Sequence, residues 1–173
     1  DCKVNPETRE VNQRKVRINK RHKVDERREL MLTTLSCIAM AVYFEARGES
    51  IIGQRAVSEV IINRVSDPRW PSSACEVVKQ PRQFSFYKAG KKYKTDPSLY
   101  IQAEAVARGA MGGDTLNTGA LYYHSTKVHP VWRHELEALG TIGSHVFYDD
   151  KSLAPVTSLR PKLRPKKLER NDE

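Results

Sequence analysis

The sequence predicts one α+β domain that is mostly helical and carries a small β element. The chain has 173 residues, which is enough for one domain with a sizeable core. Apolar residues recur at helical spacing over most of the chain up to residue 112, and capping residues precede several of these segments. Short segments rich in tyrosine, valine and phenylalanine follow only after residue 119, and they are typical of strands.

The first helix is expected from Asp25. Asp25 and Glu26 place negative charge at its start, and Gly48 is a natural stop after Glu45. The apolar residues in between follow helical spacing: Leu32, Leu35, Ala39 and Val42.

A second helix is expected over residues 53–65, where "SDPRWP" then breaks the pattern because proline disfavours helix at the residue before it. Its inner face carries Ala56, Val57, Val60 and Ile61. Ser73 followed by Glu76 forms a capping-box pattern, which predicts a short third helix through Val78.

The fourth helix is expected to begin with Asp96 as N-cap and Pro97 as first residue, and to end at Gly112–Gly113. The preceding stretch "QPRQFSFYKAGKKYK" has no clear period and indicates a loop with room for a hairpin. Beyond the fourth helix, "ALYYHS" and "HVFYD" are interpreted as short strands around an irregular segment.

The net charge of +9 is concentrated at the two ends of the chain. Residues 1–30 and 151–173 each carry a basic surplus of four, whereas residues 31–150 carry a surplus of one. We therefore expect a flexible basic arm at 1–24, a folded domain at 25–150 and a basic, proline-rich tail at 151–173. Such ends are attracted to polyanions in general, including an anionic wall or membrane, or they serve solubility alone. They do not indicate a specific nucleic-acid partner.

The cysteine count argues against a disulfide scaffold, because Cys2, Cys37 and Cys75 leave at least one thiol unpaired. Cys37 and Cys75 are interpreted as small buried hydrophobes, with a bridge between them possible in an oxidising compartment. The apolar run at 35–44 is too short and interrupted to span a bilayer. The chain starts at Asp1, so an upstream export segment can be missing from it.

The stretch "AVYFEARGES" places a carboxylate, Glu45, behind apolar and aromatic residues at a helix end. Burial there would raise the pKa of Glu45, as a general acid requires. The ordinary alternative is an exposed glutamate, or one paired with Arg47 or Arg55. Glu49 is either a second carboxylate at the site or a charge that caps the next helix, and the capping role is favoured.

Five blocks carry a resemblance to a known family: "AVYFEARGES", "GQRAVSEVIINRV", "CEVVKQPRQFSF", "ALYYHSTKVHPVW" and "IGSHVFY". Their order resembles the cell-wall hydrolases related to spore cortex-lytic enzymes, over about residues 35–149. The resemblance implies a lysozyme-like fold and lytic transglycosylase activity on peptidoglycan, in a bacterial or bacteriophage enzyme. The family's catalytic glutamate falls on Glu45. Nothing is implied for either basic end.

The implied reaction needs one acid. Glu45 protonates the oxygen between N-acetylmuramic acid and N-acetylglucosamine, and then takes the proton of the C6 hydroxyl that closes a 1,6-anhydro ring. Substrate-binding candidates are Gln83, Phe84, Ser85, Tyr123 and His124, and auxiliary candidates are Glu49 and His145. Each has a structural alternative. Either Phe84 or Phe86 belongs to the core, Tyr122 and Tyr123 face opposite sides of their strand, and His145 fixes a loop.

Three rival functions remain open. A hydrolytic muramidase would use the same acid with water, and an inactive module would only bind glycan or another polyanion. A zinc amidase would need the chain's histidines, but their spacing matches no HExxH motif. We expect no metal, no cofactor and a monomer. The expected location is the periplasm or cell wall, reached by export or by release from a phage.

Overall fold

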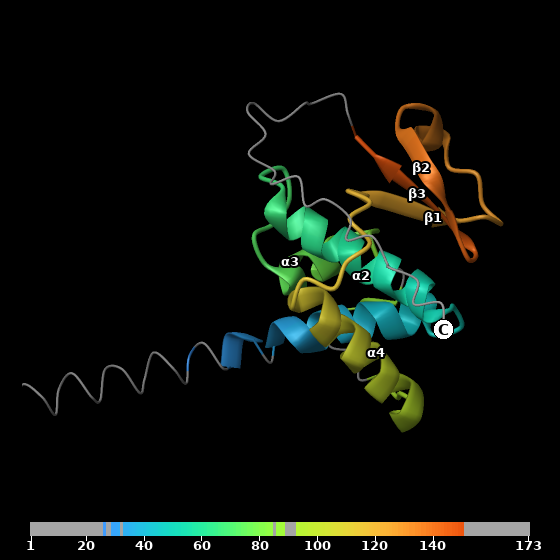
Figure 1. Ribbon diagram of the computed structural model, residues 1–173. Coiled ribbons are helices and arrows are strands. Elements are labelled where there is room, and N and C mark those ends of the chain that lie inside the picture. Colours follow the sequence, from blue (N-terminus) through green and yellow to red (C-terminus); the bar gives the residue numbers. More distant parts are fainter. Residues whose placement is uncertain (1–25, 27–28, 32, 85, 89–92, 151–173) are drawn as a thin grey trace, which may run out of the picture.

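The computed structural model describes residues 26, 29–31, 33–84, 86–88 and 93–150. The expected arm at 1–24 and the tail at 151–173 lie outside this part of the chain. Four helical segments precede a three-stranded antiparallel sheet (Figure 1). The first helix is continuous over 33–46, and α2 (Ile51–Ser66), α3 (Ala74–Lys79) and α4 (Pro97–Met111) follow it.

The first helix forms the centre of the larger core. Ala39 and Val42 are fully buried there, one helical turn apart, as their spacing predicts, and Ile38 next to Ala39 is fully buried as well. The window Glu29–Ala46 is long and apolar enough to cross a membrane by length and composition. The core helix of a soluble domain passes the same test, and this helix packs against its neighbours inside the fold.

Helices α3 and α4 begin where their capping residues predict, whereas α2 begins at Ile51, two positions before the expected start. Ser50 accepts from Gly53 N at the start of α2, and Ser73 accepts from Glu76 N at the start of α3. Asp96 caps α4, with Pro97 at its first position. These side chains satisfy amides that have no partner within their helix, which is why they mark the boundaries.

The sheet has the order β1-β3-β2, with β1 (Tyr122–Ser125) and β2 (Glu137–Ile142) both antiparallel to β3 (His145–Asp149). Strands β1 and β3 confirm the expectation for "ALYYHS" and "HVFYD". Strand β2 lies in the segment expected to be irregular. Its residues are exposed up to the last position, so it lacks the alternation that would have predicted it.

Helix α2 lies between the sheet and the first helix (Figure 1). One side of α2 packs through Ile61 into the larger core, and another packs through Val57 and Val60 against Phe147 of β3. Tyr123 of β1 packs against both cores. The sheet is therefore attached to the helices along one seam.

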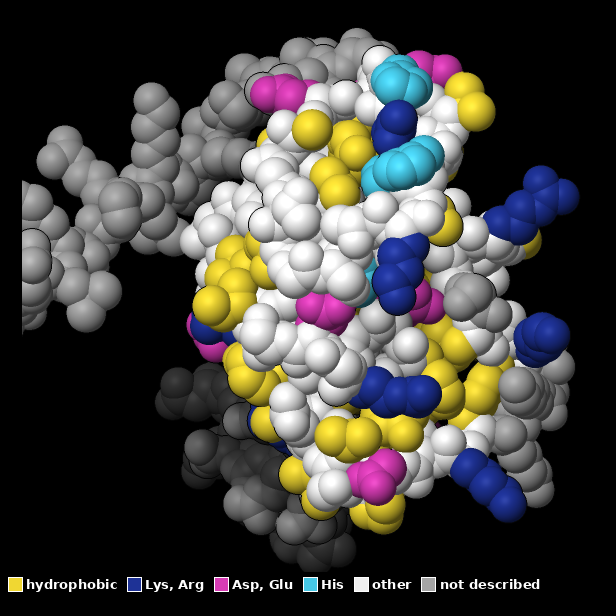
Figure 2. Space-filling model, turned by 90° about the vertical axis from the view of Figure 1, so that its right-hand side faces the viewer, with side chains coloured by type: hydrophobic (Ala, Val, Ile, Leu, Met, Phe, Trp, Pro, Cys, Tyr) yellow, Lys and Arg dark blue, Asp and Glu magenta, His cyan; other side chains and the backbone are white. Residues whose placement is uncertain are grey.

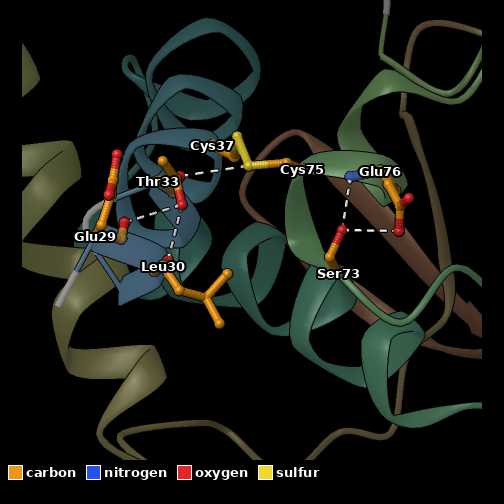
Figure 3. Close-up of a disulfide and its surroundings, with 7 residues drawn as sticks. All are labelled: Glu29, Leu30, Thr33, Cys37, Ser73, Cys75 and Glu76. Carbon is orange, nitrogen blue, oxygen red and sulfur yellow. Dashed lines mark hydrogen bonds between the residues drawn. A yellow bond between two sulfur atoms is a disulfide. The ribbon is translucent and has the colours of Figure 1, made fainter. Parts of the chain in front are cut away.

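A disulfide joins Cys37 of the first helix to Cys75 of α3, with the Cα atoms 5.2 Å apart (Figure 3). The two residues are only partly buried. Their interpretation as small buried hydrophobes is therefore wrong, and the alternative of a bridge is correct. Sequence spacing could not decide this, because a bridge depends on the distance between two helices packed in the fold.

On the face shown in Figure 2, lysine and arginine side chains stand apart from one another, with acidic side chains among them. This arrangement agrees with the small charge surplus of residues 31–150.

Candidate functional site

Glu45 lies in the last turn of the first helix, as the sequence predicts. The residue is partly buried, and its Oε1 atom is shielded from solvent. Val42 and Ala46 beside it are buried in the two cores. Glu45 is therefore held against the protein interior, while part of the residue still reaches the surface.

Tyr123 of β1 is the tyrosine that faces Glu45. Burial raises the pKa of the Tyr123 hydroxyl well above its usual value, and the neighbouring Glu45 carboxylate raises it further. Tyr122 points to the opposite side of the strand, where its ring lies 5.6 Å from that of Trp70 and 5.9 Å from that of Trp132. The expectation that the two tyrosines face opposite sides is confirmed.

Glu49 contacts the tip of the β2–β3 hairpin. Its carboxylate accepts from the Ser144 hydroxyl and, at 3.2 Å, from the Ser144 amide. The hydrogen bond from the Ser144 side chain holds the pKa of Glu49 below its usual value. The favoured capping role of Glu49 is wrong, because Ser50 caps α2. A serine after Glu49 offers a shorter side chain that reaches the helix amides, and this leaves Glu49 free for the hairpin.

The two candidate histidines lie on different faces of the sheet. Nδ1 of His145 lies 3.9 Å from Glu49 Oε1, and its ring stands edge-on to Tyr123 at 5.2 Å. Desolvation lowers the pKa of His145, an effect that Glu49 opposes and His124 reinforces. Both ring nitrogens of His124 have protein partners, the Ser125 carbonyl and the Tyr148 hydroxyl, each at 2.9 Å. A substrate contact by His124 stays a prediction.

The loop after α3 supplies the remaining candidates. Phe84 is buried at 3% exposure and belongs to the larger core, so little of its ring is open to a sugar. Phe86 is partly buried and stacks on Phe44 of the first helix, with centroids 4.8 Å apart. Gln83 is exposed. The call on Ser85 lies outside the described residues. The binding roles of this loop stay predictions.

Glu59 is a buried charged residue that the sequence reasoning missed. Its carboxylate is 1% exposed and accepts from the amides of Leu116, Thr118 and Gly119, and from the Thr118 hydroxyl. These contacts hold the loop that leads into β1. A glutamate on an otherwise apolar helix face was the available signal, since such a charge must find partners to be buried.

Arg64 is a second buried charge on α2. Its Nε donates to the Leu121 carbonyl at 2.7 Å, and its guanidinium lies 4.1 Å from the centroid of Trp70. Burial lowers the pKa of Arg64 to about 10. Together with Glu59, Arg64 fixes both ends of the segment that enters β1.

Within the described part of the chain, no group of three or more His, Cys, Asp and Glu side chains could hold a metal ion.

Similarity to a known protein family defines the class of the protein. The family model for cell wall hydrolases matches residues 48–148, which is more than half of the chain. The chain belongs to the cell wall hydrolase family. The matched region begins three positions after Glu45, so the family match by itself does not include this residue, whereas it includes Glu49.

Curated relatives are spore cortex-lytic enzymes. The chain is 32% identical to that of Halalkalibacterium halodurans over 114 residues, and 31% identical to that of Bacillus cereus over 113 residues. Each alignment covers 65% of this chain but only 34% and 43% of the respective relative. The chain thus spans less than half of these proteins.

Two solved structures resemble the fold. They are the catalytic domain of the Bacillus cereus SleB protein and that of the germination-specific lytic transglycosylase SleB from Bacillus anthracis. Each match has a TM-score of 0.59 and 32% identity over 67% of this chain, covering 89% and 93% of the solved chains. The expected fold class, α+β and mostly α, and the resemblance to this family are confirmed.

Proposed function

We propose that the protein is a peptidoglycan lytic transglycosylase that cleaves the bond between N-acetylmuramic acid and N-acetylglucosamine, with Glu45 as its acid and base. The observation that carries the proposal is the position of Glu45. Its carboxylate lies at a helix end, with one oxygen shielded from solvent and a tyrosine hydroxyl beside it. A relative of the same fold bears the name lytic transglycosylase.

The reaction is balanced with one carboxyl group. Protonated Glu45 donates to the glycosidic oxygen, the C1–O bond breaks, and positive charge develops on the sugar ring. The resulting carboxylate accepts the proton of the sugar's C6 hydroxyl as that oxygen attacks C1. The products are a 1,6-anhydro end and a free sugar hydroxyl, and Glu45 is protonated again.

The environment of Glu49 favours this one-acid route over a two-carboxylate hydrolase. A base that activates water must be free to accept its proton. The Glu49 carboxylate already accepts two hydrogen bonds from Ser144 in the hairpin. We therefore assign it a structural task.

The disulfide between Cys37 and Cys75 supports action outside a reducing cytosol, since such bonds persist in oxidising compartments. We propose the cell wall or periplasm as the place of action, reached by export or by phage-mediated release. Peptidoglycan strands are the proposed partner, with the basic ends of the chain assisting attraction to an anionic wall or membrane.

The test is product analysis of digested peptidoglycan by mass spectrometry, with wild type, Glu45→Gln and the matched control Glu135→Gln. Glu135 is exposed and follows the short 3-10 helix Val131–His134 that precedes β2. We expect anhydro-muropeptides from wild type and the control, and none from Glu45→Gln. Ordinary reducing ends would identify a hydrolytic muramidase instead. Wall binding without any release of product from wild type would identify an inactive glycan-binding module.

A further inference from the structure

We propose that the sheet face opposite Tyr123 is a second contact surface for peptidoglycan, where sugar rings lie along a row of aromatic side chains and a carboxylate of the polymer binds at one end of that row. The outer aromatic row consists of Trp70, Tyr122 and Trp132. The proposal rests on peptidoglycan as the proposed substrate, but it does not depend on Glu45 as the acid.

The outer aromatic row brings together three segments of the chain. Trp70 lies in the connection between α2 and α3, Tyr122 on the edge strand β1, and Trp132 in the 3-10 helix Val131–His134. The ring centroid of Tyr122 lies 5.6 Å from that of Trp70 and 5.9 Å from that of Trp132. All three residues are partly buried, so part of each one remains at the surface.

Buried side chains fix the row from the protein side. The buried Arg64 guanidinium lies 4.1 Å from the ring centroid of Trp70. Trp132 packs on the buried His124 and Tyr148, with ring centroids 5.6 and 5.5 Å away. These partners take one side of each indole and leave the exposed part for a ligand. Rings that are already ordered lose little entropy on binding, and the C–H face of a sugar ring packs on them.

Polar groups border the row at its Trp70 end. Arg69, next to Trp70 in sequence, donates to the Asp67 carboxylate at 2.6 Å and to the Asp150 carboxylate at 2.9 Å. Asp150 directly follows β3, the strand that pairs with β1. All three charged side chains reach the surface. Carboxylates accept hydrogen bonds from sugar hydroxyls and a guanidinium donates to them, so this border suits the polar edge of a sugar.

A cluster of hydrogen-bond donors lies at the Trp132 end of the row. Arg133 follows Trp132, and its Nη1 and Nε atoms lie 2.6 Å from His129 Nδ1 and 3.2 Å from His134 Nε2. Because arginine has no acceptor, both of these imidazole nitrogens accept, and the other nitrogen of each ring carries the proton. Both histidines are exposed. The donor cluster of His129, Arg133 and His134 therefore presents N–H groups and a positive charge to an anion.

The two ends of the row together favour an anionic glycan. Peptidoglycan joins sugar rings to the carboxylates of its stem peptides, so one strand can occupy the aromatic row and the donor cluster at once. A single-stranded nucleic acid also combines stacking with contacts to cations. At the other end, however, Asp67 and Asp150 outnumber the single Arg69 between them, and this negative surplus would repel a phosphate backbone.

The outer aromatic row is separate from the proposed acid. Tyr122 and Tyr123 point to opposite faces of β1, and Tyr123 packs in the smaller core with Ala46, the neighbour of Glu45. Loss of the row should therefore weaken attachment to the wall and leave the cleavage step unchanged. The effect is expected on insoluble walls, where two contacts on one polymer reinforce each other, and not on short soluble fragments that fill only the cleavage site.

The experiment compares Trp132→Leu and Arg133→Gln with the control Val131→Ala in the full chain. Val131 is 82% exposed in the same 3-10 helix, and Arg133→Gln leaves the ring packing intact. Binding to purified peptidoglycan is measured by sedimentation in a Glu45→Gln background, and product release is measured on walls and on soluble glycan fragments. We expect wall binding to weaken about tenfold in the first two variants, with slower release from walls and release from fragments within about twofold of wild type.

Three results would overturn the proposal. One is wall binding by Arg133→Gln equal to that of the Val131→Ala control. Another is an equal loss of activity on walls and on fragments at an unchanged melting temperature, which would place these residues at the cleavage site. The third is tighter binding of single-stranded DNA than of peptidoglycan that both variants abolish. If Glu45→Gln still digests walls, the proposed function fails, whereas the binding comparison still decides the role of the row.

Discussion

The buried carboxylate of Glu59 offers a sharp test of how this domain is held together. It receives four hydrogen bonds from the segment before β1, three on Oε1 and one on Oε2. A carboxylate is the only glutamate form that accepts on both oxygens without donating. In Glu59→Gln, the amide oxygen can keep one set of donors, and the new NH₂ group then faces a backbone N–H.

The cost can be worked from these contacts. If the glutamine oxygen takes the place of Oε1, the bond from Leu116 N at 2.6 Å is lost, and two donors meet there. A hydrogen bond to a charged group contributes about 1.5–3 kcal/mol, and a neutral one about 1 kcal/mol. Losing one bond and weakening the others should cost about 3 kcal/mol, after part of the burial cost of the charge is recovered.

The assay is denaturant unfolding followed by circular dichroism, together with the melting temperature. A loss of about 3 kcal/mol corresponds to a drop of roughly 10 °C for a domain of this size. Glu76→Gln is the matched control, because Glu76 is exposed and its carboxylate accepts a hydrogen bond from the Ser73 hydroxyl at the surface. It should change stability by less than about 0.5 kcal/mol. Equal stabilities of the two variants would refute the reasoning.

Three further predictions concern the hairpin, the pH dependence and the disulfide. Gly143→Ala should lower the free energy of unfolding by about 3 kcal/mol, since it displaces Glu49 as well as straining the backbone. The control Gly113→Ala is also at positive φ but has open space around it, and it should cost about 1–2 kcal/mol. Equal losses of the two variants in thermal unfolding would contradict the collision with Glu49. Burial lowers the pKa of His145, so the imidazole binds its proton at higher pH in the unfolded chain than in the folded one, and stability should fall as the pH drops below 6.5 toward the folded pKa. The hydrogen bond from Ser144 lowers the pKa of Glu49, so the contribution of the Glu49 carboxylate to stability should be lost below about pH 4.5. Urea unfolding from pH 8 to 3 checks this, and a profile unchanged by Glu49→Gln in the lower window would refute the second assignment. Reducing the disulfide, which links residues 38 positions apart, should lower the free energy of unfolding by up to about 4 kcal/mol. An unchanged melting temperature in dithiothreitol would show that the bridge does not stabilise the fold.

Helix positions were predictable because their signals are local. Ser73 and Asp96 cap amides within the next three residues, and Pro97 occupies the first helical position. The helix starts can therefore be predicted from the order of residues along the chain. The strands β1 and β3 were predictable from short apolar runs. Strand β2 was not, because its exposed residues carry no alternation of buried and exposed side chains.

The position of Glu45 at a helix end was also local information, and its proposed role came from the resemblance of the blocks around it. The partners of Glu49 were not accessible in this way. Ser50 is the neighbour of Glu49 in sequence, but the hydroxyl that donates to the Glu49 carboxylate belongs to Ser144. Ser144 lies 95 positions away in sequence, and only the fold brings it to Glu49. The same holds for Glu59 and for the pairing of Cys37 with Cys75.

The amino-acid sequence by itself determined the helices, two of the three strands, the family and the helix end that carries Glu45, because capping, periodicity and motif order act over a few residues. Only the tertiary structure decided which polar groups meet: Glu49 with the hairpin, and Glu59 with the segment before β1. The physical reason is that a buried charge must be satisfied by donors wherever the packed chain provides them, and those donors lie far from it in sequence.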